Sequence, residues 1–170
     1  MKKYILILII LSLFALLSAV IGNASQVGFA RLQYDGGGDW YNDPEVLPNL
    51  ARYVNSVLNT NFPLDQNVVK ASDPKLFDFP FVYMTGHGNI RWSEQEVQNL
   101  RNWMLRGGFL YADDDYGMDT AFRREIKKVF PEYELVELDS RFPLFTCFYD
   151  FSSGLPKIHE HDGKPPQAFG

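Results

Sequence analysis

The sequence predicts an α/β domain built on a mostly parallel sheet with helices on its faces. The main indication is residues 81–117, where an apolar strand, a glycine-rich polar loop, a helical segment, a Gly-Gly stop and a second apolar strand follow one another. A crossover helix returns the chain to the same edge of a sheet, so the two strands are expected to be parallel. A second indication is the apolar run 79–85, which is typical of a strand buried on both faces. A length of 170 residues fits one such domain.

Residues 1–25 have the composition of a targeting segment. Lys2 and Lys3 precede an apolar stretch at 4–21, and small residues at 22–24 supply a cleavage pattern. The stretch is also close to the roughly 18 residues at which a membrane span becomes feasible. The small-residue pattern favours a cleaved signal peptide, and an uncleaved N-terminal membrane anchor is the alternative that stays open. In either case residues 26–170 are expected to form a single exported domain, in the periplasm or cell envelope, that meets the membrane only through the leader.

Charge and cysteine content narrow the class of protein. Lys2 and Lys3 are two of the 16 basic residues, so 14 basic and 21 acidic residues remain after the leader. An acidic domain without a basic cluster is a poor nucleic-acid binder, because neutralising phosphates supplies most of that affinity. Cys147 is the only cysteine, so no internal disulfide is expected. It lies in an aromatic stretch, which predicts a buried, unreactive thiol.

The first half of the domain is expected to hold two strands and a helix. Residues 29–34 alternate in character and predict a strand, which runs into three glycines. Asp43 and Pro44 then suggest the N-cap and first turn of a helix whose apolar residues recur up to Leu58. Residues 67–71 predict a short edge strand.

The second half continues the alternation of strand and helix. Ser93 with Glu96 three residues later predicts a capping box, and Gly107 with Gly108 ends that helix. Residues 109–112 predict the next strand, with the aspartates following it, and Asp119 is the expected cap of a helix over 120–130. Residues 134–138 alternate cleanly and predict one more strand. The chain after 139 is loop-like, which predicts that further closing elements of the domain lie beyond residue 170; a flexible tail is the alternative.

Polar residues follow three of the predicted strands and are expected to meet at one edge of the sheet. Parallel strands place such residues at the carboxyl edge, where open α/β sheets bind their ligands. We therefore predict a ligand-binding site there and add the segment 159–162, which contains two of the three histidines. The candidate residues are Asp35, Gly36, Gly37, Asp39, Trp40, Gly86, His87, Gly88, Asn89, Asp113, Asp114, Asp115, Tyr116, His159, His161 and Asp162.

A divalent metal is a candidate cofactor of this site. Carboxylates and imidazoles are common ligands of divalent cations, and Asp114, His159 and His161 are the candidate ligands. The alternative is a set of loops that hydrogen-bond one another, since a run of aspartates is often a turn or a helix cap. Nucleophilic catalysis has little support, because the loop after the central strand reads T-G-H-G-N and lacks the nucleophile elbow.

Five motifs together resemble a known bacterial family: FARLQYDGGGDWYNDP, YMTGHGNIRWS, RGGFLYADDDYGMD, FRREIKKVFPE and GLPKIHEHDGKPPQAFG. The chain looks like the domain of unknown function 4159 family over the whole segment after the leader. The resemblance implies a three-layer, flavodoxin-like fold similar to class I glutamine amidotransferases, and an exported or envelope-associated protein. It also implies a continuation beyond residue 170. His87 stands where those amidotransferases have their cysteine elbow, which argues against glutaminase activity.

Three hypotheses follow from the sequence. The first is a non-catalytic envelope domain that binds a ligand or a partner protein, neither of which the sequence names, through the carboxyl edge. The second is a metal-dependent hydrolase that uses the His/Asp cluster, with one carboxylate activating water. The third is a structural module whose polar loops only bond to one another. Whether the protein is an enzyme stays open at this point.

Overall fold

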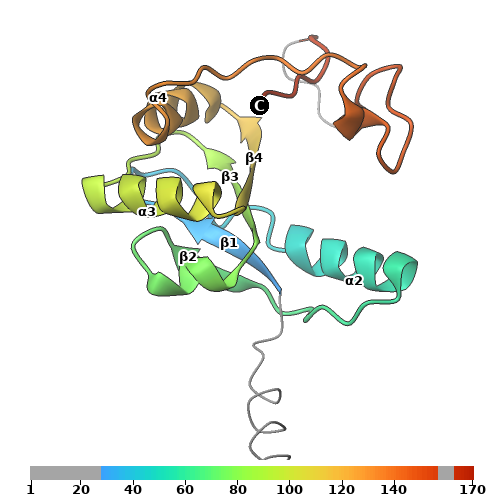
Figure 1. Ribbon diagram of the computed structural model, residues 1–170, viewed down its shortest axis with the longest axis horizontal. Coiled ribbons are helices and arrows are strands. Elements are labelled where there is room, and N and C mark those ends of the chain that lie inside the picture. The colour runs from blue at the N-terminus through green and yellow to red at the C-terminus, as the bar shows by residue number, and fades with distance from the viewer. Residues whose placement is uncertain (1–27, 157–162) are drawn as a thin grey trace, which may run out of the picture.

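A four-stranded parallel sheet forms the centre of the protein in a computed structural model that describes residues 28–156 and 163–170 (Figure 1). The strands lie in the order β2-β1-β3-β4, and each neighbouring pair is parallel. Their bounds are Phe29–Gln33 for β1, Asn67–Lys70 for β2, Phe81–His87 for β3 and Phe109–Tyr116 for β4. The parallel α/β fold predicted from the sequence is confirmed.

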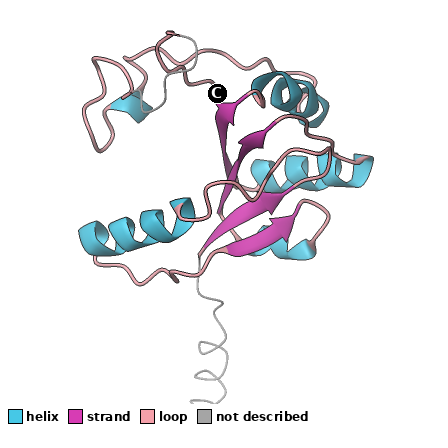
Figure 2. Cartoon of the chain, turned by 180° about the vertical axis from the view of Figure 1, so that it is seen from behind, coloured by secondary structure: helices cyan, strands magenta, loops and turns pink. Residues whose placement is uncertain are grey.

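Helices cover the two faces of the sheet unequally. Helix α2 (Val46–Leu58) lies on one side, and α3 (Glu94–Leu105) with α4 (Asp119–Val129) lies on the other (Figures 1 and 2). Two short 3₁₀ helices, η1 (Pro74–Asp78) and η2 (Pro143–Phe145), interrupt the loops. The arrangement is the three-layer, flavodoxin-like architecture that was expected.

The strand pattern divides the buried residues between the two faces. Successive side chains of a strand point to opposite faces. One set is wholly apolar and belongs to the hydrophobic core: Ala30 and Leu32 of β1, with Val82 and Met84 of β3. The other set carries buried polar groups: Arg31 of β1, and Tyr83 and Thr85 of β3. The middle of β3 is therefore buried on both faces, but one face is apolar and the other carries polar groups.

Helix α3 begins as the sequence predicts. The Ser93 hydroxyl accepts a hydrogen bond from the Glu96 amide, and the Glu96 carboxylate accepts one from the Ser93 amide. The reciprocal pair satisfies two amides that would otherwise lack partners at the helix start. Gly108 follows the helix end, where a Cβ would lie 2.2 Å from the ring of Trp103. Only glycine fits between this ring and the start of β4.

The two other helix starts differ from their predictions. Glu45, not Asp43, is the N-cap of α2, and Asp43 takes a left-handed conformation with φ 51°. Met118 is the N-cap of α4 and gives no side-chain hydrogen bond. The acceptors at this second start come from Asp114, whose carboxylate takes the amides of Met118 and Asp119. Asp114, about one helical turn before the N-cap position, therefore supplies the cap, and the local sequence pattern did not predict this.

Strands β3 and β4 extend further toward their carboxyl ends than the sequence predicts. Strand β3 extends through Gly86 to His87, and β4 extends through all three aspartates to Tyr116. Parallel pairing between the two strands continues to their ends, with one irregularity between Gly86 and His87, so backbone bonds override the low strand propensity of aspartate. The aspartates therefore lie within the strand and not after it.

The C-terminal segment departs most from the predictions. Residues 134–138 do not join the parallel sheet, and Glu137 instead makes an isolated antiparallel bridge with Phe169. Alternation alone could not identify the partner of this segment. Cys147 is exposed, against the prediction of a buried thiol. Among the residues that the structure describes, no helix is long and apolar enough to cross a membrane.

Candidate functional site

Three segments that follow or end strands meet at His87. The ring Nδ1 lies 3.0 Å from Asp39 Oδ2, and Nε2 lies 3.1 Å from Asp115 Oδ2. Asp39 belongs to the loop after β1, His87 ends β3, and Asp115 lies near the end of β4. Strands β1, β3 and β4 are neighbours, so the predicted convergence of these residues at the carboxyl edge is present.

Asp39 holds His87 with both carboxylate oxygens. Oδ2 contacts the ring, and Oδ1 accepts a short hydrogen bond from the His87 backbone amide. That backbone bond, followed by the bond to the ring, lowers the pKa of Asp39. The bond to Asp39, supported by the nearby charge of Asp115, raises the pKa of His87. The pair favours an imidazolium held between two carboxylates.

The glycines of the β1 loop allow this close approach. The Gly38 amide donates to the Asn89 carbonyl at 3.0 Å, and the Asn89 side chain donates to the Gly36 carbonyl at 3.1 Å. A Cβ on Gly36 or Gly38 would lie less than 3 Å from backbone of the 87–91 segment. Gly36 and Gly38 thus allow one loop to pack closely against the other. Gly37 and Gly88 differ, because a Cβ on either would meet nothing within 4 Å.

Gly86 serves the same purpose at the end of β3. Its φ is 140°, and a Cβ there would lie 2.4 Å from the Tyr34 hydroxyl and 3.0 Å from the carboxylate of Asp39. Any side chain at this position would push Asp39 away from His87. Gly86 is therefore required for the contact between Asp39 and His87, although it contributes no side chain.

Arg31 anchors the loop that carries Asp39, and sequence reasoning missed it. The guanidinium is buried and donates to the carbonyls of Trp40, at 3.0 Å, and Asp43, at 2.7 Å, with a short bond to the carbonyl of Asn42. It also donates to Gln66 at 3.0 Å. Desolvation lowers the pKa of Arg31. An arginine at an inward position of an otherwise apolar strand was the available signal.

Aromatic rings complete the surroundings of this anchor. The Arg31 guanidinium lies over the ring of Tyr83, 5.2 Å from its centroid, and Tyr83 stacks on Tyr111 of β4. Trp40 is partly buried against the core, so the loop after β1 is held by packing as well as by hydrogen bonds.

The three consecutive aspartates have three different environments. Asp115 contacts His87 and accepts a 2.8 Å hydrogen bond from Asn42. Asp114 caps α4, as described above. Asp113 has an exposed side chain, yet partial loss of hydration and the nearby charges of Asp115 and Asp43 raise its pKa. Strand β4 thereby supplies a contact to His87 from Asp115, the cap of α4 from Asp114, and in Asp113 a carboxylate close to other carboxylates.

Two buried hydroxyls lie on the same face of the sheet as Asp113. Thr85 is paired with Asp113 across the β3–β4 ladder, and Tyr83 lies two residues before Thr85 and therefore on the same face of β3. Neither hydroxyl has a hydrogen-bond partner among the described residues. Burial raises the pKa of Tyr83 to about 12, and the same cause raises that of Tyr34 to about 12. Both phenols are therefore protonated at neutral pH and are poor nucleophiles.

A second charged cluster supports the site from the side of α4. Glu125 is buried and accepts hydrogen bonds from the Trp92 amide at 2.9 Å, from Lys128 at 2.7 Å and from Arg124 at 2.9 Å. Burial opposes ionisation of Glu125, but the bonds from Lys128, Trp92 and Arg124 outweigh it and lower its pKa. Arg124 also donates to Asn89 and to the Ile90 carbonyl. The sequence analysis missed this cluster.

The remaining predicted site residues have varied positions. Asp35 lies 3.6 Å from Lys70, and its carbonyl accepts from the Arg91 amide at 2.6 Å. Tyr116 is exposed beside His87, its Cα partner across the ladder. His159, His161 and Asp162 lie outside the described residues. Within residues 28–156 and 163–170, no group of three or more His, Cys, Asp or Glu is arranged to hold a metal ion.

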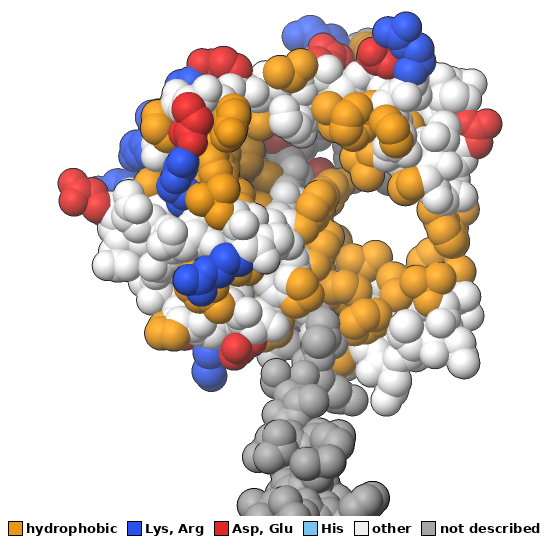
Figure 3. All heavy atoms as spheres, viewed as in Figure 1, with side chains coloured by type: hydrophobic (Ala, Val, Ile, Leu, Met, Phe, Trp, Pro, Cys, Tyr) orange, Lys and Arg blue, Asp and Glu red, His pale blue; other side chains and the backbone are white. Residues whose placement is uncertain are grey.

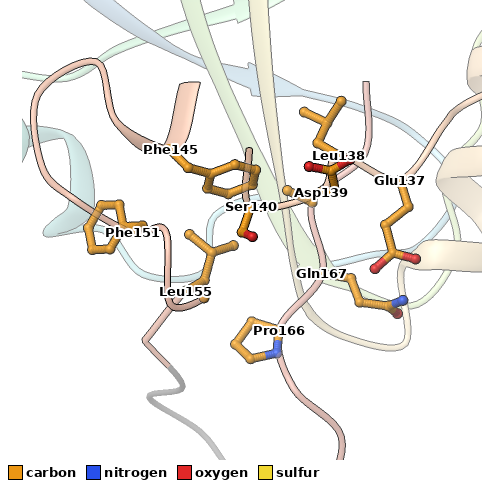
Figure 4. A pocket seen from close by; sticks show the side chains of 11 residues that line it. Glu137, Leu138, Asp139, Ser140, Phe145, Phe151, Leu155, Pro166 and Gln167 are labelled. Carbon is orange, nitrogen blue, oxygen red and sulfur yellow. The ribbon is translucent and has the colours of Figure 1, made fainter. Parts of the chain in front are cut away.

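Two cavities lie near the C-terminal segment, away from His87. A pocket of about 160 Å³ is enclosed by residues from three stretches of that segment, including Phe145, Phe151, Leu155 and Gln167 (Figure 4). A larger groove of about 1010 Å³ runs past Phe109 of β4. Figure 3 shows hydrophobic side chains gathered around an opening on this side of the molecule.

A family model for a domain of unknown function, DUF4159, matches residues 28–170. The chain belongs to the DUF4159 family. The match covers the whole segment that carries the sheet, the helices and the His87 site, so the site belongs to the family's domain. No curated protein matches the chain.

Proposed function

We propose that this DUF4159 domain is a ligand-binding module of the bacterial cell envelope that uses the carboxyl edge of its sheet. The observation that carries the proposal is the clamped His87, bound at both ring nitrogens by Asp39 and Asp115 from two different segments. The ring is nevertheless about half exposed, as its side chain keeps 47% of its accessible surface. A structural ion pair has no need of that exposure, whereas a binding surface requires it.

The chemistry of the edge favours a ligand rich in hydrogen-bond donors. Carboxylates accept but do not donate, and six of them lie in the segments 35–43 and 113–117. Exposed phenol rings stand beside them at Tyr41 and Tyr116. Hydroxyl and ammonium groups would meet the carboxylates, and a flat apolar face of the ligand would stack on a ring. An amino sugar combines these features and is the ligand class that we propose.

A non-catalytic role requires the fewest additional groups. The Nδ1 of His87 is hydrogen-bonded to Asp39, and Nε2 lies 3.1 Å from a carboxylate oxygen of Asp115, so the ring can take a metal or a substrate proton only after one carboxylate moves. The hydrolase alternative requires metal ligands from 159–162, which lie outside the described residues. Metal content separates the two functions, because a hydrolase of this kind holds a stoichiometric divalent ion that is lost in His161→Ala and Asp114→Ala.

The binding proposal is tested by titrating the purified full chain with glucosamine and following by NMR the backbone amide resonances near positions 39, 87 and 115, which are present in the wild type and in every variant. We expect saturable shifts in the wild type and none in His87→Ala, with equal unfolding temperatures for both proteins. Asp139→Ala serves as the matched control, since Asp139 is exposed and pairs only with Arg141 among the contacts described. Absence of shifts in the wild type, or loss of folding in His87→Ala, contradicts the proposal.

A further inference from the structure

The amino edge of the sheet, where the strands begin, presents large apolar side chains to solvent. Single exposed apolar residues are ordinary on protein surfaces, but several on one edge indicate an interaction surface. The residues are Leu58 at the end of α2, Leu64 before β2, Phe77 in η1, Leu105 at the end of α3 and Phe109 at the start of β4. Every connection that leads into β2, β3 or β4 thus contributes at least one.

Ring contacts join much of this edge into one surface. Phe29 lies 4.9 Å from Phe62 and 5.5 Å from Phe81, and Phe81 stacks on Phe109 at 5.8 Å between ring centroids. The Phe109 amide donates to the Pro80 carbonyl at 2.8 Å, which fixes the start of β4 beside the start of β3. An aromatic row therefore runs across three strands to the exposed ring of Phe109, which also lines the large groove.

Phe77 is linked to the same edge through a cation. The Arg106 guanidinium, at the end of α3, lies over its ring, 5.3 Å from the centroid. Arginine beside aromatic rings is frequent where proteins meet lipid headgroups, because the ring enters the boundary and the cation binds phosphate.

The two edges of the sheet differ in charge. The amino-edge segments 58–66, 75–80 and 105–109 contain two acidic residues, Asp65 and Asp78, and two basic residues, Lys75 and Arg106. The carboxyl-edge segments 35–43, 87–91 and 113–117 contain six aspartates and one arginine. An anionic membrane surface would repel the carboxyl edge, which has an excess of negative charge. It would not repel the amino edge, where the acidic and basic residues balance.

The leader enters the domain at this apolar edge. Its apolar stretch ends at Ile21, and Gly28 directly precedes Phe29, the first residue of β1. Residues 22–27 form the whole connection, and a chain of that length reaches about 20 Å when fully extended. A leader retained in the membrane would therefore hold the amino edge close to the bilayer surface.

We propose that the amino edge lies against an anionic phospholipid bilayer. Its apolar side chains enter the headgroup region beside a retained leader, and the carboxyl edge with His87 faces away from the membrane. The domain thus has a second membrane contact in addition to the leader. Ligand binding at the carboxyl edge is independent of this contact, so either proposal can fail without the other.

The test uses the full chain, synthesised in the presence of vesicles of phosphatidylcholine and phosphatidylglycerol. An environment-sensitive fluorophore is attached to a single cysteine, Leu64→Cys or Leu105→Cys, in a Cys147→Ser background. Tyr41→Cys, an exposed position at the carboxyl edge, is the matched control. Part of the lipid carries a nitroxide quencher on its headgroup, and all three substituted positions are exposed, so folding is expected to be preserved.

We expect quenching at positions 64 and 105 to exceed that at position 41 by about threefold, because only the amino edge reaches the headgroups. The proposal is overturned if chains that co-float with the vesicles show equal quenching at positions 64, 105 and 41. Blue-shifted emission at 64 and 105 without quenching also overturns it and shows that a second copy of the chain covers this edge. A chain that does not float with the vesicles overturns it as well.

Discussion

Charged residues hold the carboxyl edge in two ways, one buried and one exposed. Arg31 and Glu125 are each about 1% exposed, and every bond they make fixes a loop or a helix in place. Asp39, His87 and Asp115 use similar bonds, but their side chains keep between 25% and 47% of their accessible surface. Burial makes a charged group expensive to leave unpaired, whereas exposure leaves it available to a ligand. The first set therefore serves the fold, and the second serves the site.

The largest effect is expected for Arg31→Met, which keeps most of the volume and removes the donors. Three loop carbonyls and Gln66 lose their partner in a buried position, so the free energy of unfolding should fall by about 3 to 4 kcal/mol. Urea denaturation measures the loss. Arg52→Met is the control, because Arg52 is exposed on α2, and it should change stability by less than about 0.5 kcal/mol. A similar loss of unfolding free energy in the two variants would mean that the buried bonds of Arg31 do not stabilise the fold.

Glu125→Ala should have the next largest effect. The buried Trp92 amide loses its acceptor, but Lys128 and Arg124 are about half exposed and regain water, which limits the loss to about 2 to 3 kcal/mol. The control is Glu132→Ala, whose carboxylate is exposed and pairs with Arg101, so this variant should lose less stability than Glu125→Ala. Thermal and urea unfolding of both variants would check the order. A smaller loss in Glu125→Ala than in Glu132→Ala contradicts it.

Adjacent aspartates offer a sharper comparison. Asp114→Ala removes the acceptor for two amides at the start of α4 and should cost about 1 kcal/mol, the usual value for a lost helix cap. Asp113→Ala removes a carboxylate whose pKa is raised by its surroundings, so its loss should leave stability unchanged or slightly improved. Chemical denaturation of the two variants at pH 7 measures the difference. Equal losses would mean that the cap assignment is wrong.

A small, pH-dependent effect on stability is expected from the exposed pair of Asp39 and His87. Folding raises the pKa of His87, so the pair contributes fully below the ordinary histidine pKa of about 6.5, and the contribution is lost as pH rises through the raised value. Folding lowers the pKa of Asp39, so its share is present above about 3.9 and is lost as pH falls through the lowered value. The total should stay below about 1 kcal/mol because both groups are solvated.

Titration of the His87 ring by NMR tests this pair directly. Asp39→Asn should lower the titration midpoint of His87, since the largest cause of the raised pKa is removed. Asp115→Asn should lower it less, because Asp115 acts only through its charge. An unchanged midpoint in Asp39→Asn would mean that the clamp does not form in solution.

The sequence by itself determined the parallel sheet, the edge at which the site lies and the reciprocal cap of α3. These features depend on local patterns: apolar runs, glycine stops and a serine three residues before a glutamate. Backbone geometry then forces the ends of β1, β3 and β4 to one edge, so His87, Asp39 and Asp115 could be grouped before their contacts were known. The family resemblance rested on the same segments and is confirmed by the match over residues 28–170.

Only the tertiary structure decided which polar residue does what. The anchoring role of Arg31 and the cluster at Glu125 depend on burial and on partners remote in sequence, which a one-dimensional pattern does not encode. The capping role of Asp114 depends on the continuation of β4 through all three aspartates. The segment 134–138 shows the same limit, because its alternation is that of a strand while its partner is residues 168–170. Periodicity reports which face of an element is apolar, and it is the packing of elements against one another that assigns each charge its partner.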